Sequence, residues 1–212
     1  LTHLVSFVWR IQDEICWAIL SSRELRHGLL KVASKVDSSQ AGNDDKTGDS
    51  FYTVRLVGAL GVTDALLDAN HVRHKAVSLS SAGAEVFGGV DVTKASARVS
   101  ECVEDTVGMT EPVPEVLAMD ATSAIRNVIG GITENMSYLN RAADIRVRFT
   151  GAYWRCPHRE GRWEEGEFLG EDIGTKSVPE ERHWALRSQF NLVQPACLKR
   201  LPRPAAGAPG GA

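Results

Sequence analysis

The chain has 212 residues, a formal net charge of −3 and 43% hydrophobic residues, so it is long enough to bury a core without a metal or a disulfide. The slight acidic excess argues against a nucleic-acid partner, because general nucleic-acid-binding proteins carry a clear basic excess. No apolar run approaches the roughly 18 residues of a membrane-spanning helix, and the first residues lack a signal-peptide pattern. We therefore expect a cytoplasmic protein that contacts no membrane.

The first half of the chain is predicted to contain one helical segment and two strands. Apolar residues recur at helical spacing in residues 4–36, which predicts a largely helical segment, and the polar stretch at residues 37–50 indicates a loop. Residues 51–57 are rich in β-branched and aromatic side chains, which predicts a strand. A second short strand is expected at residues 77–79, where apolar residues and serines alternate.

The second half is predicted to contain two helices and a strand. Residues 92–107 place their apolar side chains in one helical stripe, with Thr93 as a candidate N-cap and Gly108 at the end. A second helix is expected at residues 119–139. Residues 144–149 alternate apolar side chains with two arginines, which predicts a half-buried strand.

These elements predict one α/β domain at residues 1–150. Residues 151–199 are charged and contain tryptophans, and we expect them to form a divergent C-terminal extension. Residues 200–212 consist largely of proline, glycine and alanine and are expected to be a disordered tail. We predict no metal site, because the possible ligand pairs His71 with His74 and Cys156 with His158 fit no standard site.

The helix expected at residues 119–139 is amphipathic. Its apolar residues, among them Ile125 and Ile129, form a stripe about 100° wide. Gly130 and Gly131 lie in its middle, where each costs about 1 kcal/mol relative to alanine. That cost indicates either crowded packing against a neighbouring element or the close approach of a partner. The polar face is formed by Asp120, Ser123, Asn127, Glu134 and Tyr138.

Residues 107–131 resemble the signature region of the CheX/CheC chemotaxis phosphatases, in which an acidic connection precedes a helix of the form D-A-x-x-E-I-x-N-M-I-x-G. The matching residues are Asp120, Ala121, Ile125, Asn127, Ile129 and Gly131. The resemblance extends loosely over residues 4–149. It implies an α/β (α+β) fold with helices packed on an antiparallel-rich sheet.

The resemblance implies a protein that hydrolyses the aspartyl phosphate of a response regulator. Asn127 would hold the attacking water, since an amide can accept a hydrogen from water while donating to the phosphoryl group. The partner regulator would supply Mg²⁺, so no cofactor of the protein's own is expected, and a homodimer is compatible with the resemblance. The face toward the regulator would consist of Asp120, Ser123, Ala124, Gly130, Gly131 and Glu134.

One departure from the family pattern leaves the function open. The glutamate of the motif falls on Ala124, which has neither charge nor hydrogen-bonding capacity. The protein is then either a weakened phosphatase or a non-catalytic signalling domain of the same fold. A third alternative is an unrelated small α/β protein whose helix matches by chance.

Overall fold

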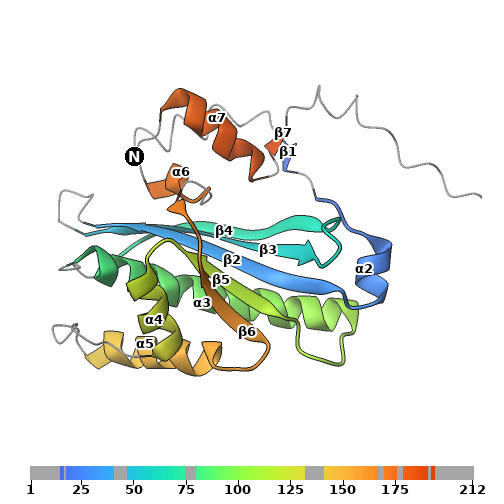
Figure 1. Ribbon diagram of the computed structural model, residues 1–212, viewed down its shortest axis with the longest axis horizontal. Helices are drawn as coiled ribbons and strands as arrows, with labels where there is room; N and C mark the ends of the chain where they lie inside the picture. The colour runs from blue at the N-terminus through green and yellow to red at the C-terminus, as the bar shows by residue number, and fades with distance from the viewer. Residues whose placement is uncertain are drawn as a thin grey trace, which may run out of the picture.

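The computed structural model describes residues 15–16, 18–40, 47–74, 80–131, 141–166, 170–175, 179–190 and 192–193. A five-stranded sheet, in the order β4-β3-β2-β5-β6, forms the centre of the molecule (Figure 1). Its strands are β2 (Leu30–Ser39), β3 (Asp49–Gly58), β4 (Asp64–Arg73), β5 (Glu115–Met119) and β6 (Arg159–Trp163). The first three pair antiparallel, whereas β5 is parallel to β2 and β6 is parallel to β5.

Helices cover both faces of this sheet. On one face lie α3 (Ser81–Val107), α4 (Thr122–Gly130) and α5 (Arg141–Trp154). On the other lie α6 (Asp172–Thr175) and α7 (Glu180–Ser188) (Figure 1). The short helix α2 (Ser22–Arg26) precedes β2, and β1 (Ile15–Cys16) pairs with β7 (Leu192–Val193). The predicted α/β class, with helices packed on an antiparallel-rich sheet, is confirmed.

The core lies between the sheet and α3. Leu30, Val32 and Val36 alternate along β2 and are buried in one cluster with Val86 and Val90 of α3. Burying an aliphatic side chain of this size stabilises the fold by roughly 1.5–3 kcal/mol. The alternate residues of β2 face the other side of the sheet, toward α6 and α7.

A buried carboxylate joins four elements on the parallel side of the sheet. Glu115, the first residue of β5, is 1% exposed and accepts hydrogen bonds from Arg159 Nε of β6 at 2.6 Å and from Tyr153 Oη of α5 at 2.7 Å. Ser96 Oγ of α3 donates to it at 2.7 Å. Burial, together with the neighbouring carboxylate, raises the pKa of Tyr153. This network fixes β5 against its neighbours.

The prediction for residues 4–36 is wrong for most of its described part. Only Ser22–Arg26 is helical, and Leu30–Ser39 is a strand, whereas residues 1–14 lie outside the described residues. Leu25, Val32 and Val36 fit a helical stripe, but Leu30, Val32 and Val36 also fit a period of two. This segment forms a strand because it pairs with β3 on one side and with β5 on the other.

Two further predictions in the second half are corrected. The segment expected as one helix at residues 119–139 divides into the end of β5 and α4, and Gly131 ends α4 as a left-handed C-cap; residues 132–140 lie outside the described part. The strand expected at residues 144–149 belongs to helix α5. Val147 and Trp154 of α5 are buried, whereas Phe149 is exposed, so the short alternation is not the burial pattern.

The strand at residues 51–57 and the helix at residues 92–107 are confirmed within β3 and α3, and Gly108 ends α3 as predicted. Thr93 is not the N-cap, because α3 begins earlier, at the Ser80 cap. The Thr93 hydroxyl instead donates to the Gly89 carbonyl and accepts from Trp154 Nε1. The strand expected at residues 77–79 lies outside the described residues.

The boundary expected at residue 150 falls inside α5, and β6 beyond it pairs with β5. Residues of the expected extension therefore contribute a strand to the central sheet. The tail at residues 200–212 lies outside the described part of the chain. Within that part, no helix is long and apolar enough to cross a membrane, and the cytoplasmic location stays a prediction.

Candidate metal centre and adjoining groove

Two neighbouring parallel strands each carry an aspartate near their carboxyl end: Asp37 lies two residues before the end of β2, and Asp120 directly follows β5. In β2 and β5, Lys35 pairs with Ala118, and Asp37 and Asp120 each stand two residues further along their strands. Parallel strands carry their carboxyl ends at the same edge of a sheet. The pairing therefore places two carboxylates side by side that are far apart in the sequence.

A third carboxylate reaches the same place from α3. Oxygens of Asp37, Glu85 and Asp120 lie within 4.8 Å of one another. Asp37 and Glu85 are buried, with 1% and 6% of their surface exposed, and Asp120 is half-buried. We call these three residues the carboxylate cluster.

The close approach of α3 to the sheet depends on Gly88, one helical turn after Glu85. A Cβ at this position would lie 2.3 Å from Ser38 Oγ, 2.7 Å from Ser50 Oγ and 2.9 Å from Val36 Cγ2. Contacts this short require the Ser38, Ser50 and Val36 side chains, or the helix itself, to shift. Gly88 therefore sets the depth at which Glu85 enters the cluster.

We expect Gly88→Ala to displace α3 from β2 and to destabilise the protein by about 1–3 kcal/mol, the usual cost of overpacking. The variant should also weaken binding of Mg²⁺ to the cluster, because Glu85 moves with the helix. Chemical denaturation and calorimetric titration with Mg²⁺ measure the two effects. Unchanged stability and unchanged metal binding would contradict the packing that we describe.

The chain beyond β6 completes the surroundings of the cluster. Trp163 Nε1 donates to the Asp120 carbonyl at 2.8 Å, and a Cβ on Gly166 would lie 3.4 Å from Asp120 Oδ2. The Thr175 hydroxyl of α6 donates to Asp37 Oδ2. The segment that we expected to be a divergent extension therefore orients the Asp37 carboxylate and holds the backbone of Asp120.

A buried hydrogen-bonded chain lies behind Asp37. Ser38 Oγ and Ser50 Oγ are 2.7 Å apart, and Ser50 Oγ is 2.6 Å from His74 Nε2. Burial lowers the pKa of His74, so this ring is neutral at pH 7. His74 therefore adds no positive charge near the cluster.

The carboxylate cluster fits a divalent cation. Carboxylate oxygens are the ligands that Mg²⁺ and Mn²⁺ prefer. Three carboxylates this close repel one another unless a cation or protons lie among them. The separations also suit the coordination sphere of one ion, in which ligand oxygens around Mg²⁺ stand about 3–4 Å apart.

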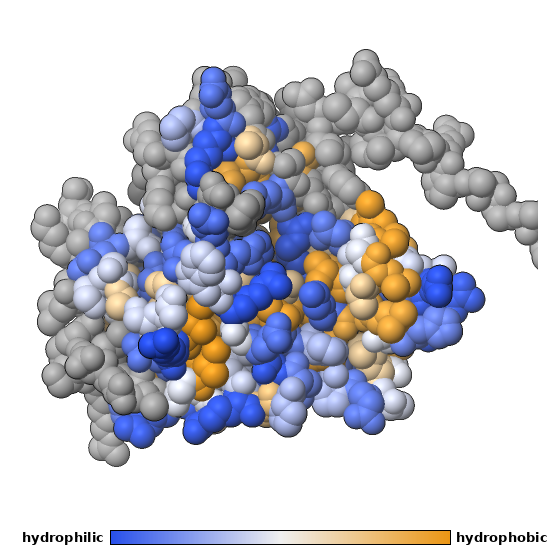
Figure 2. All heavy atoms as spheres, viewed as in Figure 1, coloured by the Kyte–Doolittle hydropathy of each residue, from blue (hydrophilic) through white to orange (hydrophobic). Residues whose placement is uncertain are grey.

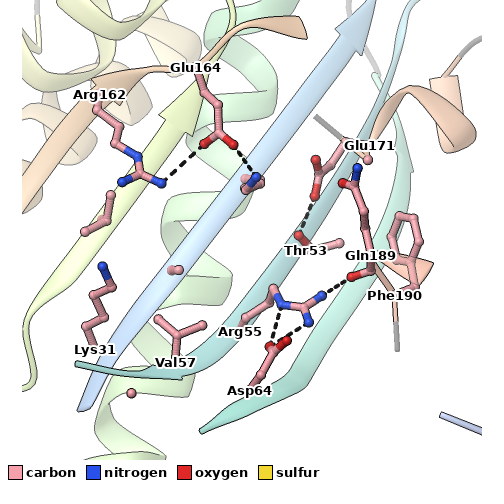
Figure 3. A pocket seen from close by; sticks show the side chains of 15 residues that line it. Lys31, Thr53, Arg55, Val57, Asp64, Arg162, Glu164, Glu171, Gln189 and Phe190 are labelled. Atoms are coloured by element: carbon pink, nitrogen blue, oxygen red, sulfur yellow. Dashed lines mark hydrogen bonds and ion pairs between the residues drawn. The ribbon is translucent and has the colours of Figure 1, made fainter. Parts of the chain in front are cut away.

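A groove of about 560 Å³ opens on the face of the sheet toward α6 and α7 (Figure 3). In Figure 2, hydrophilic side chains surround an apolar strip at the centre of the view. The floor consists of Ala33, Val57 and Val116. Charged residues of both signs line the sides, namely Lys31, Lys35, Arg55, Asp64, Arg162, Glu164 and Glu171.

Most of these charges are paired. Arg55 binds Asp64 Oδ1 through Nε at 3.0 Å and through Nη2 at 2.6 Å. Lys35 forms an ion pair with Glu164, and Arg162 Nη2 lies 3.4 Å from the same carboxylate. These pairs leave the sides of the groove polar while its floor is apolar.

Of the partner face predicted from the sequence, Asp120 lies in the carboxylate cluster. Asn127 is half-buried on α4, and Ser123 is exposed. Ala124 is fully buried, so its expected place on an exposed face is wrong. Glu134 lies outside the described residues.

The two glycines of that face serve packing. Gly130 and Gly131 are half-buried at the end of α4, and a Cβ on Gly131 would lie 3.0 Å from the Gly151 Cα of α5. Of the two explanations offered for these glycines, the structure therefore supports crowded packing against a neighbouring element.

Sequence reasoning missed Asp37 and Glu85. Asp37 follows an alternating apolar segment that we assigned to a helix, and Asp120 follows the buried run Glu115–Met119. An aspartate directly after each of two apolar runs, residues 30–36 and Glu115–Met119, was the available signal. Glu85 carries no local signal, because its position follows from the packing of α3.

Comparisons with known proteins found no matching protein-family model and no matching curated protein. Among solved structures, the chain is similar to RNase H1 of the archaeon Halobacterium salinarum, with a TM-score of 0.43, 15% identity, and coverage of 66% of this chain and 90% of that one. An N-terminal RNase H domain from Mycobacterium tuberculosis gives a TM-score of 0.41 and 14% identity over 76% of this chain and 98% of that one. LC11-RNase H1 in complex with an RNA/DNA hybrid gives a TM-score of 0.35 and 12% identity, with coverage of 66% of this chain and 88% of that one.

The resemblance to the CheX/CheC phosphatases is wrong. The similar structures are RNase H proteins, and Asp120, the first residue of the motif, lies in the carboxylate cluster after β5 and not on a helix face toward a partner. The functions derived from it, phosphatase and non-catalytic signalling domain, are corrected with it, as is the response-regulator partner. The catalytic role of Asn127 depended on that resemblance alone.

The expectation of no nucleic-acid partner is also contradicted, since two of the similar structures contain an RNA/DNA hybrid. It rested on the net charge, which is a sum over the whole chain and does not report how cations are distributed locally.

Proposed function

We propose that this protein is a divalent-metal-dependent phosphodiesterase that cleaves a nucleic-acid strand, with Asp37, Glu85 and Asp120 as the metal ligands. The main support for this proposal is that three carboxylates, two from the sheet and one from a helix, converge to within 4.8 Å of one another. Mg²⁺ in proteins is typically held by a few carboxylates together with phosphates of the substrate. A phosphate ester is therefore the substrate class that this ligand set suits best.

The residues of the site have separable roles. Asp37 and Asp120 would hold the cation from the edge of the sheet, and Glu85 would close the ligand set from α3. Thr175, by donating to Asp37, fixes the orientation of that carboxylate, as hydrogen bonds to ligating groups do in metal sites. When bound, a divalent cation would polarise the phosphoryl group and lower the pKa of a bound water.

The charges that line the groove favour a polyanionic substrate. It adjoins the cluster along β2, and cationic side chains line both of its sides, which favours contacts with a phosphate backbone. The net charge of −3 does not oppose such a substrate, because the three clustered carboxylates lie where a cation would offset them.

The test is cleavage of end-labelled oligonucleotides by the purified protein. We expect cleavage in Mg²⁺ or Mn²⁺ and none in EDTA, and we expect Mg²⁺ to raise the melting temperature, because a ligand of the folded state stabilises it. An RNA/DNA hybrid is the first substrate to try, with single-stranded RNA and DNA beside it. No metal-dependent cleavage of any of the three would overturn the assignment.

A further inference from the structure

The groove runs along β2 and away from the carboxylate cluster. Lys31, Ala33 and Lys35 line it, and Asp37 is the next residue on the same face, because every second residue of a strand points the same way. Lys35 therefore stands about 7 Å from Asp37 along the strand, and Lys31 about 20 Å. A nucleic-acid strand that leaves the cluster along β2 would therefore pass directly over the groove.

Two cations stand on the β5 side of β2. Arg162 is 51% exposed at its side chain, and Lys31 is half-buried. Among the residues that the structure describes, Lys31 makes no ion pair within 4.0 Å. Figure 3 shows both side chains on this side of the strand. Lys31 can therefore bind an anion without first breaking an ion pair, whereas Arg162 shares the Glu164 carboxylate with Lys35.

A buried carboxyl group stands on the β3 side. Glu171 is 2% exposed, and Thr53 donates its hydroxyl to Oε1. The second oxygen, Oε2, has no hydrogen-bond partner among the described residues, although Glu171 lines the groove. Leaving such an oxygen unsatisfied is unfavourable, so a ligand with an N–H or O–H donor gains by reaching it (Figure 3).

We infer that the groove binds a nucleotide of the substrate strand further along the strand from the cleaved phosphodiester, with its phosphate at Lys31 and Arg162 and a base or sugar donor at Glu171 Oε2. The volume of about 560 Å³ suits a group of this size. The apolar floor formed by Ala33, Val57 and Val116 suits the face of a base. This role of the groove rests on the proposed function of the cluster.

A nucleotide fits better than an acidic peptide. A nucleotide combines a flat ring, an anion and N–H or O–H donors, and the groove offers an apolar floor, two cations and an acceptor in matching order across β2. The carboxylates of an acidic peptide would meet the carboxylate of Glu164, which lines the groove. Like charges juxtaposed in an interface are unfavourable.

The test measures binding without cleavage, by fluorescence anisotropy of a labelled 12-mer on the Asp37→Asn protein in EDTA. We expect Lys31→Ala in this background to weaken binding and to lower the slope of log K against log salt by about one, as the loss of one phosphate contact does. Glu171→Gln should weaken binding with no change of slope, because Oε2 meets no phosphate. The control Lys94→Ala removes an exposed cation of α3 on the other face and should change neither.

The outcomes separate the groove from the cluster. If the wild type cleaves oligonucleotides but Lys31→Ala and Glu171→Gln bind as the parent does, the role of the groove is overturned and the proposed function stands. If binding depends on Lys31 but the wild type cleaves no substrate, the result would support oligonucleotide binding in the groove and contradict the proposed nuclease function. Equal binding of a nucleoside monophosphate, or of polyglutamate, would overturn the assignment to a substrate strand. Melting curves show whether Glu171→Gln folds, and Lys31→Ala keeps the test decisive if it does not.

Discussion

Asp37→Asn is expected to lower metal-dependent cleavage by at least about 10²–10³-fold, the usual cost of removing one group that stabilises charge in a transition state. The amide keeps the shape of the side chain and an oxygen that accepts from Thr175, but it lacks the negative charge that holds a divalent cation. Steady-state cleavage of the oligonucleotide substrate and calorimetric titration with Mg²⁺ measure the two losses.

The same variant should not lose stability. In EDTA we expect it to melt at the temperature of the wild type or above it, because removing one of three neighbouring carboxylates removes repulsion. Asp105→Asn is the matched control, since Asp105 is exposed near the end of α3. Cleavage by Asp37→Asn within threefold of the control would remove Asp37 from the metal centre.

Glu115→Ala is expected to be the most destabilising single change among those considered, by about 3–5 kcal/mol. Removing one partner of a buried ion pair leaves the other charge uncompensated, and here Arg159 and Tyr153 both lose their acceptor. For a chain of this length the loss corresponds to a fall of roughly 6–20 °C in melting temperature. Calorimetry and chemical denaturation measure it.

An exposed pair on the same side of the sheet provides the control. Arg148 binds Asp144 at 2.8 Å one turn away on α5, and the Arg148 side chain is 70% exposed. Arg148→Ala should therefore change the free energy of unfolding by no more than about 0.5 kcal/mol. If Glu115→Ala costs no more than this control, the buried network does not hold β5 between α5 and β6.

The sequence by itself determined the elements whose signals are local. The strand at residues 51–57 follows from its β-branched and aromatic side chains, and the helix at residues 92–107 follows from its apolar stripe and from Gly108. These features depend only on residues that are neighbours in the sequence. Together, the predicted strand and helix were enough to predict the α/β class. The assignment of residues 4–36 and 144–149 failed because short apolar patterns fit a period of two as well as one of 3.6.

Only the tertiary structure decided where the site lies. Asp37 was assigned to a loop and Asp120 to a helix, and parallel pairing of β2 with β5 brings them together. Glu85 joins them because Gly88 lets α3 approach the sheet. Pairing between distant strands and the depth of helix packing leave no periodic trace in the chain, since they depend on contacts between residues remote in sequence. The carboxylate cluster is a product of those contacts, which is why its residues could not be grouped from the sequence.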